Sequence, residues 1–154
     1  MVIHVEINKC LTFWLNLKCS NKNGLVGCKT DKSKWKVAIQ NPDNEEDYIG
    51  VLAIENKAVI TSGGYERYFE NNGKIYHHIL DTKTGYPVDN RLLSVTIISE
   101  DSLSGDALST TCFALGLKKG MRLIENTPEI EAVFIDKDYT IHTSSGLVLD
   151  EGED

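Results

Sequence analysis

The sequence lacks the long hydrophobic run that a membrane span needs. Its longest apolar stretch, from Leu92 to Ile98, is interrupted by Ser94 and Thr96 and falls far short of the roughly 20 residues of a membrane-spanning helix. The first residues also lack the basic stretch, the long apolar stretch and the small-residue cleavage site of a signal peptide. As written, the chain is therefore expected to be cytoplasmic and to have no membrane span.

Basic residues are also few. The chain has 16 lysines and arginines against 23 aspartates and glutamates, which gives a net charge of -7. An acidic chain repels phosphate backbones unless it carries a local basic stripe. The densest basic cluster, between Lys29 and Lys36, is diluted by Asp31. We therefore do not expect nucleic acid as a partner.

The four cysteines lack the spacing of a metal site or a disulfide framework. Cys10, Cys19, Cys28 and Cys112 form no Cys-x-x-Cys pair, which is the usual sign of a zinc site. Free thiols in a reducing compartment are the expected state of these residues.

The overall composition is that of a globular domain. The 154 residues are 41% hydrophobic and 25% charged, which is typical of one soluble domain. We expect an irregular N-terminal segment over residues 1–30, a folded domain over residues 31–146 and an acidic tail over residues 147–154.

Alternating apolar and polar residues predict a sheet, and turn residues separate its strands. Strands are expected over residues 35–39, 49–54, 58–62, 93–98, 131–135 and 139–143. Residues 44–47 are expected to form a solvated loop, and residues 55–57 a hairpin turn between the strands that flank them. Helices are expected from residues 102–106 to Gly116 and over residues 118–126. The predicted fold class is α+β, with a mainly antiparallel sheet and two helices.

The first predicted helix carries an acid and two hydroxyls near its start. Asp106 and Thr110 are four residues apart and share one helical face, with Ser109 beside them. Oxygen ligands near the positive end of a helix suit a hard cation such as Mg²⁺, with phosphate and water completing its shell. The alternative, which the spacing alone favours, is that Asp106 caps the helix with help from Ser104.

Two loops carry further candidate residues. Tyr76-His-His-Ile-Leu-Asp-Thr-Lys-Thr-Gly-Tyr-Pro87 combines histidines, an acid and threonines, and such a loop offers donors to a pyrophosphate. Thr61-Ser-Gly-Gly-Tyr65 allows close backbone approach, and Tyr65 suits stacking on a flat ligand. The alternatives are a histidine satisfied within the core and a plain turn at the end of a strand.

Taken together, these segments resemble the flavin transferases of the ApbE type, which are FAD:protein FMN transferases. The family's blocks occur in order as Thr61-Ser-Gly-Gly-Tyr-Glu-Arg-Tyr-Phe69, His78-Ile-Leu-Asp81 with Lys83-Thr-Gly-Tyr-Pro87, and Asp106-Ala-Leu-Ser-Thr110 with Gly116. Trp35-Lys-Val-Ala-Ile-Gln-Asn-Pro42 resembles the strand that precedes them. The resemblance covers roughly Gly24 to Gly146.

The resemblance implies a T-fold-like domain that binds FAD with Mg²⁺. Members of the family cleave the FAD pyrophosphate and transfer FMN to a Thr or Ser hydroxyl of a target flavoprotein, releasing AMP. Asp106, Ser109 and Thr110 fall on the family's metal-site positions. The family's members are usually exported or anchored to the membrane by a lipid.

The resemblance also assigns residues of the second block to the cofactor. His78 falls on the family's functional histidine and Ile79 on a position that contacts FAD. Asp81, Thr84 and Gly85 are expected to bind the cofactor beside them. His78 either takes the proton of the acceptor hydroxyl or holds the pyrophosphate, and the sequence does not separate these roles.

The sequence departs from the family's pattern in three places. The family is substantially longer, and the Asp-Leu-Gly-Gly and Lys-Gly segments of its N-terminal half do not occur here. Asn16-Leu-Lys-Cys-Ser-Asn21 stands where the family usually has Asn-Leu-Gly-Gly-Asn, and Thr82 stands where it generally has proline.

Three hypotheses follow from the resemblance and these departures. The chain is an FMN transferase, or it is a catalytically incompetent fragment or subunit that binds FAD and Mg²⁺ and needs a separate N-terminal half. The third is an α+β domain whose polar clusters are caps and turns. A missing half would leave an apolar face exposed, which predicts self-association.

Overall fold

An antiparallel sheet forms the centre of the molecule. The computed structural model describes residues 22–24, 31–42, 44–65 and 67–149. In this part of the chain, the central sheet has five strands in the order β1-β4-β7-β8-β9. Their bounds are β1 Lys22–Gly24, β4 Ala58–Gly63, β7 Leu92–Ser99, β8 Glu131–Asp136 and β9 Ile141–Thr143.

Two strand pairs and two helices surround this sheet. The first pair is a ribbon of β2 Trp35–Asn41 and β3 Asn44–Ile54, and the second is a hairpin of β5 Tyr68–Asn71 and β6 Lys74–His77. The helices are α1 Ser102–Leu115 and α2 Leu117–Glu125. None of the helices in the described ranges is long and apolar enough to span a membrane.

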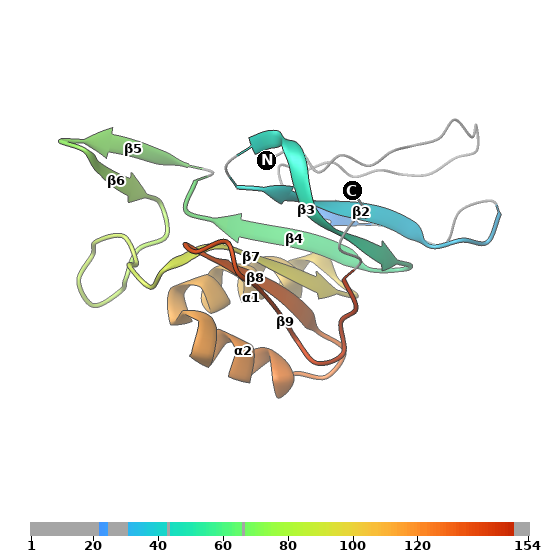
Figure 1. Ribbon diagram of the computed structural model, residues 1–154. Helices are drawn as coiled ribbons and strands as arrows, with labels where there is room; N and C mark the ends of the chain where they lie inside the picture. The colour runs from blue at the N-terminus through green and yellow to red at the C-terminus, as the bar shows by residue number, and fades with distance from the viewer. Residues whose placement is uncertain (1–21, 25–30, 43, 66, 150–154) are drawn as a thin grey trace.

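The elements form three layers, with the helices on one face of the sheet and the β2–β3 ribbon on the other (Figure 1). Side chains of a strand alternate between its two faces, and the core follows this alternation. On β7, Val95 and Ile97 pack with the helices while Ile98 packs with the ribbon. On β8, Phe134 faces the helices and Val133 the ribbon. Both faces of the central strands are therefore buried.

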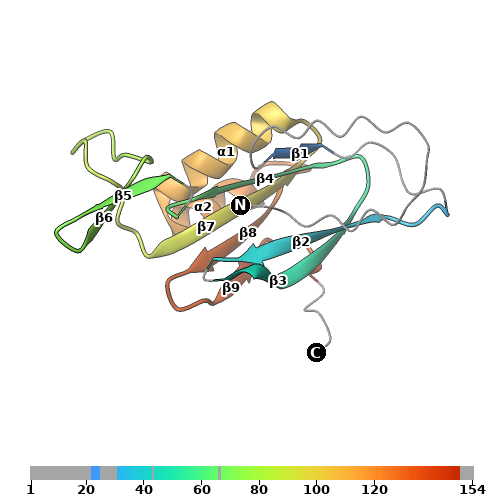
Figure 2. The same cartoon turned by 90° about the horizontal axis from the view of Figure 1, so that it is seen from above.

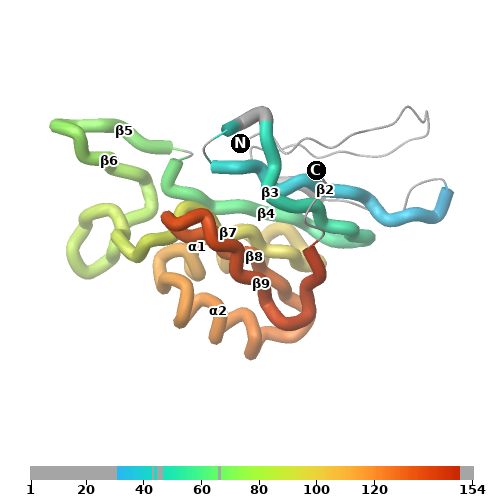
Figure 3. The backbone as a smooth tube through the Cα atoms, in the orientation of Figure 1, coloured from blue at the N-terminus to red at the C-terminus, as the bar shows by residue number. Residues whose placement is uncertain are grey.

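The hairpin of β5 and β6 extends from one end of the layers (Figures 2 and 3). Asn72 and Gly73 form its tight turn, and both have positive φ angles. After β6 the chain forms a loop over residues 78–91 and returns to the central sheet as β7. The hairpin and the loop both carry residues that were named above as candidates for the site.

The structure confirms an α+β fold with mainly antiparallel sheets and two helices. Two details of the prediction are wrong. Residues 44–47 belong to β3, because the pairing of β3 with β2 continues through two register shifts as far as Asn44, which lies opposite Asn41. Residues 55–57 do not join a hairpin, since β3 pairs with β2 while β4 pairs with β1 and β7. The chain turns there from the ribbon into the central sheet.

The N-terminal segment predicted to be irregular contributes a strand to the central sheet. Residues 22–24 form β1, which pairs antiparallel with β4. Residues 1–21 and 25–30 lie outside the described residues, and so do Asn16–Asn21 and the first three cysteines.

Helix α1 is not capped by Asp106, the residue that the alternative interpretation named. Its N-cap is Asp101, whose Oδ1 accepts a hydrogen bond of 2.8 Å from the Ser104 backbone N–H. This bond lowers the pKa of Asp101. The interpretation of Asp106 as the cap is therefore wrong, because the cap position is filled one turn earlier. The helix ends as predicted at Gly116, whose φ is 78°.

A glycine allows α1 to lie close to the sheet. A Cβ atom at Gly105 would lie 2.5 Å from Cδ1 of Ile60 on β4 and 2.7 Å from Oγ of Ser99 on β7. Both distances are shorter than real Cβ contacts, so a side chain at this position would displace Ile60 and Ser99.

We expect Gly105→Ala to destabilise the fold by about 1–3 kcal/mol, since the added methyl overpacks a buried contact. In a helix without this contact, the same substitution should stabilise the fold by about 1 kcal/mol, because alanine is the better helix former. The sign of the change in the free energy of unfolding therefore shows whether the contact is present. Urea unfolding followed by circular dichroism measures it. The control is Thr111→Ala on the exposed side of α1, for which we expect a change within about 0.5 kcal/mol. A stabilised Gly105→Ala variant would contradict the close approach.

Candidate functional site

Three hydroxyls meet where α1 crosses β4. Oγ of Ser62 on β4 lies 2.8 Å from Oγ of Ser109 and 3.2 Å from Oγ1 of Thr110, both on α1. Oγ of Ser109 also donates a hydrogen bond of 3.0 Å to the carbonyl oxygen of Asp106. Ser109 is fully buried and Ser62 is 8% exposed, while Thr110 lies at the surface. The cluster therefore runs from the interior of the fold to its surface.

Strand alternation explains why Ser62 belongs to this cluster. Its neighbour Thr61 points to the ribbon side and pairs with Thr96 of β7, with 2.9 Å between the two Oγ1 atoms. Ser62 consequently points to the helix side. Buried hydroxyls need partners, because an unsatisfied one costs roughly 1–3 kcal/mol. Each of the two hydroxyls finds a partner on its own face of the sheet.

Asp106, Ser109, Thr110 and Phe113 form one stripe along α1, at helical positions i, i+3, i+4 and i+7. The stripe places a carboxylate and the Thr110 hydroxyl one turn apart, with Ser109 buried behind them. The metal-site prediction for these three residues thus concerns one continuous surface of the helix.

The donors of this stripe suit a hard cation. In the described ranges, no group of three or more His, Cys, Asp or Glu side chains could hold a metal ion. One carboxylate and hydroxyl oxygens would instead supply a few ligands. Mg²⁺ is commonly held in this way, by one or two carboxylates with waters and substrate phosphates. The residues present therefore fit Mg²⁺ shared with a phosphate ligand.

The predicted histidine lies just beyond the end of β6. His78 is exposed, and both its backbone N–H and its ring Nδ1 lie near the carbonyl oxygen of Arg67, at 3.2 and 3.3 Å. When Nδ1 carries the proton, it donates to this oxygen, and Nε2 then has the ring's lone pair. Because His78 is exposed, the alternative of a histidine satisfied within the core does not describe it.

Ile79 is 4% exposed and packs in the core with residues of the helices. Its carbonyl oxygen accepts a hydrogen bond of 3.1 Å from the Val88 N–H. These contacts fix the loop to the body of the domain. The predicted contact of Ile79 with FAD stays a prediction.

The remaining predicted residues shape the loop that follows. Oδ1 of Asp81 accepts from the Lys83 N–H at 2.7 Å, and its carbonyl oxygen accepts from the Gly85 N–H at 2.8 Å. Oγ1 of Thr84 accepts from the Tyr86 N–H at 3.3 Å, and Gly85 has a φ of 71°. Asp81, Thr84 and Gly85 therefore form one tight turn, and their role toward a cofactor stays a prediction.

Phe113 joins the loop to the stripe on α1. The His77 ring packs edge-on against the Phe113 ring, with 5.6 Å between the centroids. The side-chain amide of Asn90 donates to the Phe113 carbonyl oxygen. The second predicted block is thus fastened to the helix one turn beyond Ser109 and Thr110.

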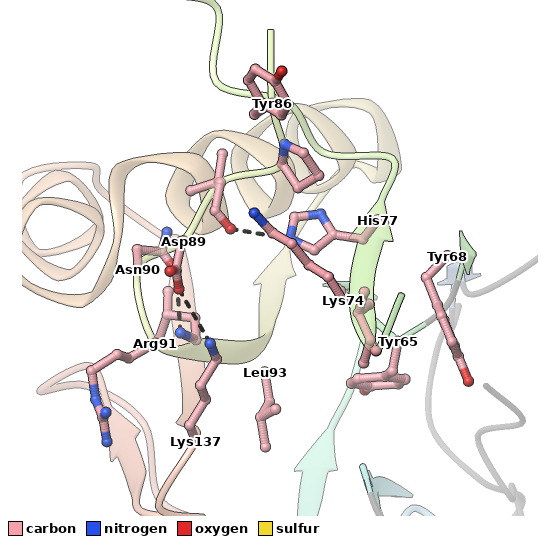
Figure 4. Close-up of a pocket in the computed structure, with 16 residues that line it drawn as sticks. Tyr65, Tyr68, Lys74, His77, Tyr86, Asp89, Asn90, Arg91, Leu93 and Lys137 are labelled. Carbon is pink, nitrogen blue, oxygen red and sulfur yellow. Dashed lines mark hydrogen bonds and ion pairs between the residues drawn. The ribbon is translucent and has the colours of Figure 1, made fainter. Parts of the chain in front are cut away.

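A pocket of about 530 Å³ lies between the hairpin, the loop and the start of β7 (Figure 4). Aromatic rings and basic groups line it together, among them Tyr65, Lys74, His77, Arg91 and Lys137. The His77 Nε2 lies 3.1 Å from the Val88 carbonyl oxygen, while its Nδ1 is buried with no hydrogen-bond partner in the described part of the chain. Tyr65, predicted to stack on a flat ligand, is placed at this pocket.

Acidic neighbours partly neutralise these basic groups. Nζ of Lys137 lies 3.2 Å from Oδ1 of Asp89, and the Arg91 guanidinium contacts both carboxylate oxygens of Asp138. The pocket is therefore a mixed polar and aromatic site with more basic than acidic groups on its wall.

Sequence reasoning missed several of these residues. Ser62 was noted only as part of a glycine turn, although its place in strand alternation marks it as facing the helix. Lys74, Arg91 and Lys137 come from three separate segments, and no local pattern relates them. Only the path of the chain brings them to one pocket.

The cysteine on α1 is unsuited to be a nucleophile. Cys112 is a free, fully buried thiol, and burial raises its pKa to about 11. Since the thiolate is the reactive form, the chemistry of the site rests on its oxygen and nitrogen groups.

Comparisons with known proteins give one consistent result. Residues 21–134 match the model of the ApbE family. A curated FAD:protein FMN transferase of Klebsiella pneumoniae (strain 342) is 46% identical over 113 residues, which are 73% of this chain and 36% of that protein. One of Treponema pallidum (strain Nichols) is 39% identical over 116 residues, 75% of this chain and 32% of that protein. The chain thus spans about a third of the length of these relatives.

Solved structures resemble the fold as well. The ApbE protein of Thermotoga maritima aligns with a TM-score of 0.77 and 35% identity, over 88% of this chain and 44% of that one. The apo form of the flavinyl transferase ApbE of Pseudomonas stutzeri aligns with a TM-score of 0.66 and 31% identity, over 83% and 40% of the two chains.

We expect Cys112 to resist alkylation while the chain is folded. With a pKa of about 11, roughly one thiol in a thousand is ionised at a pH of about 8, and the folded helix also shields it. Iodoacetamide labelling followed by peptide mass spectrometry, with and without urea, measures the modification at this residue. Labelling of Cys112 at the same rate in both conditions would place the thiol at the surface.

Proposed function

Because the chain belongs to the ApbE family, we propose that it takes part in FAD:protein FMN transfer, with Asp106 and Thr110 as ligands of Mg²⁺. The observation that carries the proposal is the stripe on α1, where a carboxylate and a surface hydroxyl stand one turn apart over buried hydroxyls. The capping role that would otherwise explain Asp106 belongs to Asp101.

Ser109 completes the proposed metal site from behind. Its hydroxyl is directed toward the Asp106 carbonyl oxygen and Ser62, so it supports the helix face that carries the ligands. When bound, Mg²⁺ would neutralise charge on the FAD pyrophosphate and favour its cleavage. The small number of protein donors leaves coordination positions for phosphate oxygens and water.

The transfer itself exchanges one oxygen for another on phosphorus. The Thr or Ser oxygen of the acceptor flavoprotein forms a bond to the phosphorus on the flavin side, the bond to the bridging oxygen breaks, and AMP leaves. The hydroxyl proton needs an acceptor. His78 suits this role, because the Arg67 carbonyl oxygen holds its Nδ1 side and Nε2 has the lone pair.

The pocket beside His77 suits a planar group that carries negative charge. Tyr65 offers a ring for stacking, and Lys74 offers positive charge at the wall. Pockets that combine aromatic side chains with a small number of placed polar groups are a common form of ligand site. We assign it to a part of FAD or of the acceptor segment.

We expect Asp106→Asn to abolish Mg²⁺-dependent binding of FAD. Residues that only support a metal ligand typically contribute roughly 10–100-fold to metal affinity. Loss of a ligand itself should weaken the affinity by more than this. Quenching of flavin fluorescence, titrated with and without Mg²⁺, measures the affinity without knowledge of the acceptor.

The matched control for this change is Asp101→Asn. It removes the same charge from the same helix, and asparagine is as good an N-cap as aspartate, so both folding and FAD binding should persist. Equal FAD affinity of the parent and Asp106→Asn would overturn the metal assignment.

With FAD and an acceptor that carries a Thr or Ser hydroxyl, we expect His78→Ala to slow AMP release by about 10²–10⁴-fold, the usual contribution of a general base. Because His78 is exposed, stability should change by no more than about 0.5 kcal/mol. Chromatography of AMP over a range of FAD concentrations separates the two roles: a base lowers kcat, whereas a pyrophosphate ligand raises KM.

The control is His142→Ala, which removes the contact of His142 with Asp136 and should leave AMP release unchanged. An unchanged rate in His78→Ala would contradict both roles.

A further inference from the structure

The three clustered hydroxyls have only one consistent direction of hydrogen bonding. A hydroxyl has a single proton to donate, and Ser109 donates its proton to the Asp106 carbonyl oxygen. In the contact of 2.8 Å between Ser62 and Ser109, Ser62 must therefore be the donor. Having donated its own proton, Ser62 can only accept in the contact of 3.2 Å with Thr110.

The chain of donors therefore runs from Thr110 to Ser62, then to Ser109, and ends on the Asp106 carbonyl oxygen. This order of donors determines how the Thr110 hydroxyl is oriented. The Thr110 proton is turned toward the interior, so the lone pairs of Oγ1 are turned toward the surface side of the helix. A cation is attracted by these lone pairs and repelled by a hydroxyl proton, so this orientation is the one that binds a metal ion.

We propose that Ser62 is a positioning residue that fixes the Thr110 hydroxyl in its metal-binding orientation. This inference rests on the proposed function, because it takes Asp106 and Thr110 as the ligands. Ser62 acts through Thr110 and not by contact with the ion, since it is buried on β4 with its hydroxyl between two α1 side chains. The close approach of α1 at Gly105 keeps the strand and the helix within hydrogen-bond distance.

Pre-orientation matters because a free hydroxyl rotates. Without Ser62, the Thr110 proton would lose its acceptor and sample positions that face the ion. Hydrogen bonds in such chains also polarise one another, so Thr110 becomes a better ligand as its proton is drawn toward Ser62. Partners of this kind typically contribute 10–100-fold to metal affinity.

The chain offers a matched control on the same strand. Thr61 is also buried, adjacent in sequence and engaged in one hydroxyl pair, with Thr96 at 2.9 Å. It faces the ribbon and not the helix. Thr61→Val removes a comparable buried hydrogen bond without touching the hydroxyl chain, and therefore separates loss of stability from loss of orientation.

The experiment is a titration of the full chain with Mn²⁺ in the presence of FAD, with free Mn²⁺ measured by electron paramagnetic resonance. Mn²⁺ accepts the same oxygen ligands as Mg²⁺. We expect Ser62→Ala to weaken Mn²⁺ binding by about 10–100-fold and Thr61→Val to keep the parent's affinity. Ser62→Cys, which keeps a side chain of similar shape but a weak hydrogen-bonding group, should weaken binding in the same direction and serves if the alanine variant does not fold.

The outcomes distinguish this inference from the proposed function. If Asp106→Asn loses Mn²⁺ while Ser62→Ala and Ser62→Cys bind as the parent does, the positioning role is overturned and the metal site stands. Equal loss in Thr61→Val and Ser62→Ala would also overturn it, since a general loss of packing would then explain both. If the parent binds no Mn²⁺, or Asp106→Asn binds as well as the parent, the metal site itself fails and the inference fails with it.

Discussion

Helix α1 lies against β4 at Gly105, where even a methyl group would collide with Ile60, and this approach makes the rest of the site possible. Hydroxyl oxygens form hydrogen bonds only within about 3.5 Å, so the helix and strand must be this near for Ser62 to meet Ser109 and Thr110. Three hydroxyls without partners would make the contact costly. Because hydrogen bonds join the three hydroxyls, they hold the helix and the strand in one specific alignment.

The covering of both sheet faces has a second consequence. Because the β2–β3 ribbon and the helices bury opposite sides of β4, all six residues of that strand are buried. Neighbouring polar residues such as Thr61 and Ser62 must then find partners on opposite faces, and they do so with Thr96 and with α1. The core thus fixes the direction of each hydroxyl before any ligand is present.

Local patterns predicted the elements better than their partners. Period-two and helical spacing located β2, β4, β7 and both helices, because each needs only a few neighbouring residues. The turn at residues 55–57 was misassigned, because the partners of a strand depend on long-range contacts, and β4 pairs with β1 and β7 and not with β3. In the site, helical spacing brought Asp106, Ser109 and Thr110 together. Ser62 and the basic residues of the pocket required the three-dimensional path of the chain.

The two parts of the proposed site rest on supports of different kinds. Asp106 and Thr110 lie on a helix held by buried hydroxyls, whereas His78 lies on an exposed loop fastened by main-chain bonds and by the packing of His77 on Phe113. Phosphoryl transfer depends chiefly on positioning and electrostatic stabilisation. An ion needs fixed ligands, while a proton acceptor must approach a hydroxyl that arrives with another protein. The division between helix and exposed loop therefore matches the two demands of the proposed transfer, and Phe113 joins the two supports through its contacts with His77 and Asn90.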